Sequence, residues 1–240
     1  MAGWAVVGVA VALYLSLVVP QLGRPLIYDE VDFARAASSL ADPDPGPGPG
    51  PLRYDRGYIA DYPTAPDAGQ RFQLALWHPP GYLLLLGLWQ RAFPSGGDSS
   101  LRLFGALCGL GTLLLTAALG RLAAGPQAGG LAALLWATSP FAIQSALLLD
   151  VDGTALPLAL ALFAWLALRP GREPWTWPAL SGAFALCLSC KLGPALALGA
   201  LLTAWPAAHG LGADSRRIGG ACLAGGGVAA GAWLLLALLA

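Results

Sequence analysis

Eight long stretches of this 240-residue chain contain no aspartate, glutamate, lysine or arginine, and they leave little choice of fold. These stretches are 1–23, 72–90, 103–120, 122–149, 153–168, 174–190, 192–213 and 218–240. A bilayer core of about 30 Å requires about 20 apolar residues per helix, so most of them are candidate membrane spans. Leucine, alanine and glycine dominate them without alternation, which favours helices over strands. The sequence therefore predicts an all-α, polytopic membrane protein.

Basic residues predict how the chain is threaded. Three short loops between the later runs carry arginine: Arg121, then Arg169 with Arg172, then Arg216 with Arg217. The positive-inside rule assigns these loops to the cytoplasm, provided that the run 79–93 does not cross. That run is short and begins at Pro79-Pro80, so we expect an interfacial or re-entrant helix. About seven transmembrane helices remain, at roughly 3–21, 101–119, 128–147, 154–168, 175–190, 194–209 and 218–238.

The first outer loop, 22–100, is expected to hold most of the residues outside the membrane. We expect an amphipathic helix from near Asp29 to Leu40 and the interfacial helix after His78. Between them, residues 42–51 alternate proline with aspartate or glycine, which favours an extended linker. Residues 1–23 lack a basic leader, so a retained helix is favoured over a cleaved signal peptide. The chain 1–240 is predicted to be a single transmembrane domain.

Charge and cysteine content exclude some function classes. The net charge is zero and no basic run exceeds the Arg216-Arg217 pair, which argues against nucleic-acid binding. All four cysteines lie in apolar runs, so a disulfide framework is not expected. Cys187-x-x-Cys190 has redox or metal spacing, yet it has no second pair, and we interpret both cysteines as small packing residues.

Acidic residues beside the predicted spans are the clearest pointers to function. Asp29 and Glu30 follow the first span, while Asp150, Asp152 and the only lysine, Lys191, fall on the same predicted face. Carboxylates next to a membrane are costly to dehydrate, so this face is expected to hold a water-filled reaction cavity. Plainer alternatives remain open, because acids also cap helix amino termini and a lysine at a span end can snorkel to the interface.

Four segments then resemble a known family, the GT-C membrane glycosyltransferases of the protein O-mannosyltransferase, aminoarabinose-transferase and rhizobial lipopolysaccharide-transferase type. The resemblance covers the chain in family order. The segments are Tyr28-Asp29-Glu30 with Ala34–Ala37; His78-Pro79-Pro80-Gly81-Tyr82-Leu83; Leu101-Arg102-Leu103-Phe104-Gly105; and Ser139-Pro140 through Asp150-Val151-Asp152-Gly153, with Gly182 to Pro194 containing Cys190-Lys191-Leu192-Gly193-Pro194.

The resemblance implies transfer of a sugar from a polyprenyl-phosphate donor to a hydroxyl of a lipid, glycan or protein acceptor, on the extracytoplasmic side of a plasma or inner membrane. The attacking hydroxyl must lose a proton, which implies a carboxylate base; Asp29, with Glu30, is the candidate. Negative charge grows on the departing phosphate, so cations should face it. By resemblance these cations are His78, Arg102 and Lys191, and Asp150 and Asp152 form a second acidic site.

The sequence leaves open the metal cofactor, the function class and the completeness of the chain. Asp29, Asp150 and Asp152 would suit a divalent metal ion such as Mg²⁺ or Mn²⁺, but relatives differ in metal use, so the cofactor is unknown. A small transporter or channel subunit, or a non-catalytic scaffold, is the alternative to a transferase. Members of the family it resembles usually carry more spans and often an outer carboxy-terminal domain, so by this resemblance we expect a fragment, a minimal enzyme or one half of an assembly.

Overall fold

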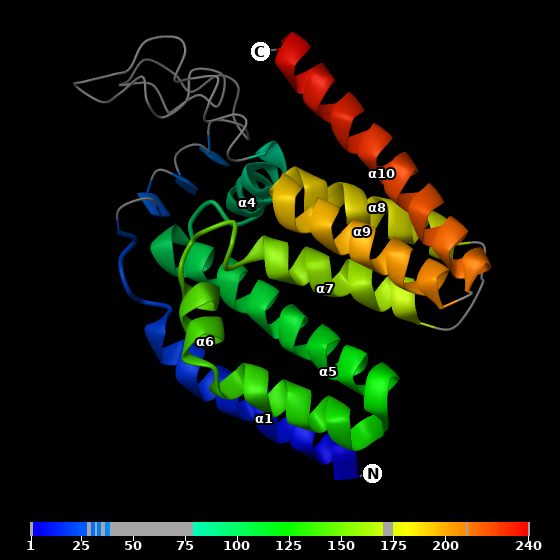
Figure 1. The fold of residues 1–240 in the computed structure, drawn as a ribbon. Helices are drawn as coiled ribbons and strands as arrows, with labels where there is room; N and C mark the ends of the chain where they lie inside the picture. Colours follow the sequence, from blue (N-terminus) through cyan, green and yellow to red (C-terminus); the bar gives the residue numbers. More distant parts are fainter. Residues whose placement is uncertain are drawn as a thin grey trace.

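The computed structural model describes residues 2–27, 30, 31, 33, 34, 37, 38, 79–169, 175–209 and 211–239. Asp29, His78 and the predicted linker at 42–51 lie outside these residues. The described part is all-helical, as predicted, and contains no strand (Figure 1). Its helices are α1 (Ala2–Val18), the 3-10 turn η1 (Val19–Gln21), α4 (Pro80–Ala92), α5 (Gly97–Thr138), α6 (Pro140–Leu147), α7 (Ala155–Leu168), α8 (Thr176–Cys190), α9 (Leu192–Ala208) and α10 (Gly212–Leu239).

Most helices run side by side, so that the molecule has two ends (Figure 1). At one end α1, α6 and α8 finish and α7 and α9 begin; we call it the acidic end, because Glu30, Asp150 and Asp152 lie there. At the other, the arginine end, α1 and α8 begin and α7 and α9 finish. Arg121 and Arg169 lie at the arginine end, over the rings of Trp4 and Trp175 at 5.0 and 4.1 Å.

Within the described residues, two segments are long and apolar enough to cross a membrane, Gly3–Gln21 and Gly97–Thr138. Only 28% and 39% of their most apolar windows are buried inside the protein, so most of their side chains are free to face lipid. The apolar helices α7, α8 and α9 have 14, 15 and 17 residues. These lengths are below the usual span, so the count of seven spans stays a prediction.

The long helix α5 is two helices joined at a sharp turn. Ala124 leaves the helical region, and Gly125 has a φ of +86°, which favours glycine because other residues are strained there. Pro126 follows, where its missing N–H costs nothing at the start of a helix. The chain therefore reverses near the place expected from the sequence, between the predicted spans 101–119 and 128–147.

The predicted span 128–147 is wrong as one continuous helix. It breaks between α5 and α6 at Ser139, which is extended with a ψ of 116°. Pro140 causes the break, since proline has no N–H to donate and disfavours the helical conformation of the residue before it. The Ser139 hydroxyl then caps the new helix by accepting from the Ala142 N–H at 3.3 Å.

Helix α4 covers most of the predicted interfacial run 79–93. It appears nearly end-on in Figure 1, where α1, α5 and α7 run across the view, so it lies across the other helices rather than alongside them. This is the orientation expected of an interfacial helix. The described residues between 30 and 38 are also helical, and Ala34 and Ala37 are buried, as an amphipathic helix requires.

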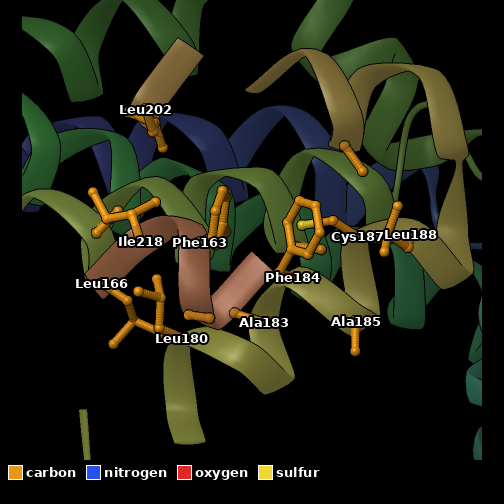
Figure 2. Close-up of a cluster of buried hydrophobic side chains, with 14 of the residues drawn as sticks. Phe163, Leu166, Leu180, Ala183, Phe184, Ala185, Cys187, Leu188, Leu202 and Ile218 are labelled. Carbon is orange, nitrogen blue, oxygen red and sulfur yellow. The ribbon is translucent and has the colours of Figure 1, made fainter. Parts of the chain in front are cut away.

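The core between α7, α8, α9 and α10 is packed by apolar side chains (Figure 2). Phe163 and Phe184 lie at its centre with ring centroids 5.1 Å apart. Cys187 is fully buried among them, and all four cysteines are free thiols. Cys187 thus has the surroundings of a packing residue.

Candidate functional site

A buried ion pair between Glu30 and Arg102 is the best-defined polar feature of the acidic end. The two side chains are each 6% exposed, and the guanidinium meets the carboxylate through two parallel bonds of 2.9 Å. Arg102 lies in the first turns of α5, 72 positions along the chain from Glu30. Such a bidentate pair is among the stronger charge-assisted contacts in proteins.

Arg102 uses all of its donors within the protein. Its Nε donates to the Arg24 carbonyl at 2.7 Å, its Nη2 donates to the Pro25 carbonyl at 2.6 Å, and its Nη1 donates to the Leu147 carbonyl. With the two bonds to Glu30, these account for the five N–H groups of a guanidinium. No donor is left for a phosphate in this arrangement, which points to a structural role for Arg102.

The carboxylate of Glu30 also uses its hydrogen-bonding capacity within the protein. One carboxylate oxygen accepts from Arg102 and from the Leu149 N–H at 2.8 Å, and the other accepts from Arg102 and from the Ile27 N–H at 2.9 Å. A carboxylate that accepts four hydrogen bonds has no lone pair left to receive an acceptor hydroxyl. This arrangement leaves Asp29, which precedes Glu30 in the sequence, as the candidate base of the pair.

The Glu30–Arg102 network connects segments that are far apart in the chain. It joins the segment after η1 to the start of α5 and to the end of α6. Because Leu149 precedes Asp150, the network also brings the first-loop acid next to the second acidic site. The structure therefore brings one described member of each group of predicted site residues, Glu30, Arg102 and Asp150, to the same end of the bundle.

Lys191 and Asp152 form a second, more exposed ion pair. The lysine Nζ lies 2.8 and 2.5 Å from the two carboxylate oxygens of Asp152, and the side chains are 37% and 47% exposed. Lys191 stands in the short break between α8 and α9, where its backbone is extended. An exposed amine on a flexible stem can leave Asp152 for another anion at small cost, unlike Arg102.

Helix α4 brings the segment after His78 against the end of α8. A Cβ added to Gly81 would lie 2.4 Å from the Cβ of Ser189, so only glycine permits this approach. Tyr82, the next residue, is buried with its hydroxyl near Thr154 and without a hydrogen bond of good geometry to any described residue. Burial, with a smaller contribution from Asp150, raises the pKa of Tyr82, so the phenol stays neutral.

A cavity of about 470 Å³ opens at the acidic end between residues 26–38, the end of α4 and the start of α5. Its wall carries Asp98, whose carboxylate accepts from the Leu26 N–H at 3.1 Å, and Gln90, which donates to the Ala34 carbonyl at 3.0 Å. Neither Asp152 nor Lys191 lines it. The acidic end thus holds water-accessible space beside the ion pair, on the α4 side.

The predicted metal site is not assembled by the described residues, which contain no group of three or more histidine, cysteine, aspartate or glutamate side chains in metal-binding proximity. Asp29 and His78 fall outside the described residues, so a site that needs them stays a prediction. Asp150 and Asp152 supply carboxylates two residues apart, which suits oxygen-ligated cations only with a further ligand.

Sequence reasoning missed the backbone partners of this site. The carbonyls of Arg24, Pro25 and Leu147 and the N–H of Leu149 give no signal in a sequence, because any residue supplies them. An arginine at the start of a long apolar run, such as Arg102, could have suggested an acidic partner, since a charge that leaves water needs a partner of opposite sign. The sequence does not say that this partner is Glu30.

Comparison with models of known families gives a match over much of the chain. Residues 77–215, more than half of the chain, match the model of the family described as dolichyl-phosphate-mannose-protein mannosyltransferase. The match includes Arg102, Asp150, Asp152 and Lys191, and it confirms the resemblance drawn from the motifs. No curated protein and no solved structure matches the chain significantly. The chain belongs to the dolichyl-phosphate-mannose-protein mannosyltransferase family.

Proposed function

We propose that this membrane glycosyltransferase moves a sugar from a polyprenyl-phosphate donor to an acceptor hydroxyl outside the cytoplasm, at the acidic end of the bundle. The observation that carries the proposal is the convergence of Glu30, Leu149 and the adjacent Asp150 through one hydrogen-bonded network. A transferase needs a base and an anion-binding group close together in water, and this end supplies acids and an exposed lysine, with a cavity on its α4 side that Lys191 does not line.

The proposed roles follow from the hydrogen bonds and ion pairs that each side chain already makes within the protein. Asp29 is the general base, because its neighbour Glu30 is saturated by four hydrogen bonds. Lys191 binds the departing phosphate, because Asp152, its ion-pair partner among the described residues, is half-exposed and easily exchanged. Glu30 and Arg102 act as positioning residues, and His78 is a second candidate for phosphate contact through its link to Pro79 and α4.

The chemistry requires little more than these groups. As the acceptor oxygen attacks the anomeric carbon, its proton passes to the base while the bond from that carbon to the phosphate oxygen breaks. The polyprenyl phosphate leaves with an additional negative charge, which the lysine ammonium stabilises. A polyprenyl tail keeps the donor in the bilayer beside the acidic end, so the donor need not pass through water.

The test is sugar transfer in proteoliposomes supplied with radiolabelled polyprenyl-phosphate-mannose and envelope extract as acceptor. Asp29→Asn should reduce transfer by about 10²-fold or more, the usual range for a lost general base, with unchanged thermal stability. The matched control is Asp214→Asn in the first turn of α10, at the arginine end. Undiminished transfer by Asp29→Asn would refute the assignment of the base. Solute flux without any transfer by the wild type would favour the transporter.

A further inference from the structure

A second cavity, of about 530 Å³, lies at the arginine end, far from the acidic groups. Helices α1, α5 and α7 line it, and its wall is almost entirely apolar, with Leu114, Ala118 and Leu122 from α5 and Trp165 from α7. Trp4 closes one side and is 63% exposed. Volumes of this size hold small ligands in many proteins.

One charged group, Arg121, stands at this cavity. Its guanidinium lies 5.0 Å from the centroid of the Trp4 ring, a cation–π contact that holds it beside the apolar wall. No carboxylate among the described residues forms a salt bridge with it. In the part of the chain that the structure describes, the site thus combines an apolar trough with one positive charge that has no salt-bridge partner.

The position of Arg121 along α5 places it near a membrane surface. The helix from Arg102 to Arg121 rises by about 28 Å at about 1.5 Å per residue, close to the thickness of a bilayer core of about 30 Å. With Arg102 at the acidic interface, Arg121 reaches the opposite one. Trp4 and Trp165 lie at the same level, where indole rings favour lipid headgroups.

We propose that this cavity binds one anionic glycerophospholipid from the leaflet at the arginine end, with an acyl chain in the apolar trough and the headgroup phosphate on Arg121. Charge complementarity selects this occupant, since a free phosphate would leave the apolar wall unfilled and an uncharged chain would leave the arginine unpaired. Leu114 and Leu122 are 46% and 41% exposed, so the trough is continuous with a surface that faces lipid. This lipid site is independent of the proposed transferase chemistry.

The test uses delipidated protein in detergent, titrated with phosphatidylglycerol or phosphatidylcholine and followed by native mass spectrometry. The first phosphatidylglycerol should bind more tightly than the first phosphatidylcholine. Arg121→Gln should weaken the first phosphatidylglycerol by about fivefold, the effect of one basic residue near an anionic headgroup, and should weaken phosphatidylcholine less, because choline already balances the charge of its phosphate. Ala118→Phe, which fills the trough, should weaken both lipids.

The control is Arg216→Gln, an exposed arginine at the same end that does not line the cavity. It should leave both affinities as in the wild type. Equal weakening by Arg121→Gln and Arg216→Gln would mean diffuse surface attraction and would overturn the proposal. So would equal affinity of the wild type for the two lipids, or an unchanged first binding event in Ala118→Phe.

Discussion

The buried Glu30–Arg102 pair should be the single most sensitive polar contact of this protein. In Glu30→Gln the side chain keeps its shape but gains an NH₂ group and loses its charge. Each carboxylate oxygen now accepts two N–H groups, one from Arg102 and one from the backbone of Ile27 or Leu149. Whichever way the amide is turned, its NH₂ therefore faces two donors, and neither orientation can be satisfied.

The size of the effect follows from burial. Both side chains are 6% exposed, so the substitution leaves an arginine charge buried without its counter-ion, which typically costs about 3 to 5 kcal/mol. For a chain of this length each kcal/mol corresponds to about 2 to 4 °C, so the midpoint of thermal unfolding should fall by about 10 °C. The matched control is Asp152→Asn at the exposed pair, which should cost less than about 1 kcal/mol.

Replacing both members by methionine extends the test. Apolar substitution of a buried ion pair is often harmless, but here it would strand three carbonyls and two N–H groups that now bond to the pair. We therefore expect no recovery in the double variant. Fluorescence-detected size-exclusion chromatography of heated, detergent-solubilised protein measures all three variants. A Glu30→Gln midpoint equal to that of Asp152→Asn would refute the reasoning.

Two further predictions concern the acidic end. Lys191→Met should raise the KM for a polyprenyl-phosphate sugar by about tenfold, which is the cost of one charge-assisted hydrogen bond. The control Asp152→Asn should leave this KM unchanged. If steady-state kinetics change alike in both variants, the lysine only pairs with Asp152. Gly81→Val should lower transfer and thermal stability together by forcing α4 away from α8, and Ser189→Gly should not rescue it, since the Ser189 carbonyl oxygen also lies 2.7 Å from the added Cβ. Rescue in the double variant would show that side-chain crowding alone is responsible.

The helical fold could be predicted because its cause is local. Long uncharged, apolar runs are unfavourable in water and favourable in lipid. The helices α7, α8, α9 and α10 therefore coincide with those runs of the sequence. Helix ends were less accurate: α5 begins at Gly97, before the predicted start at 101, because a helix can continue beyond the membrane. Pro140 alone would have predicted the helix break at Ser139. The continuous apolar run around it favoured a single span instead.

The gathering of candidate residues at one end of the bundle was predictable, but the hydrogen bonds that each of them makes were not. That Glu30, Asp150 and Lys191 belong to one end follows from the alternation of spans and loops. That Arg102 is saturated depends on where the carbonyls of Arg24, Pro25 and Leu147 come to rest, which is a property of the folded backbone. Long-range pairing of this kind leaves no pattern in a single sequence, so Arg102 and Lys191 looked equally suited to phosphate.

The account rests on the acidic end facing the outside of the membrane and the arginine end facing the cytoplasm. Single cysteines at Asp152→Cys and Arg216→Cys, in a Cys222→Ser background, test this directly, because the remaining cysteines are buried. A membrane-impermeant maleimide should label position 152 in intact cells and position 216 only after permeabilisation. Labelling of both from the same side, or in the reverse order, would contradict the account.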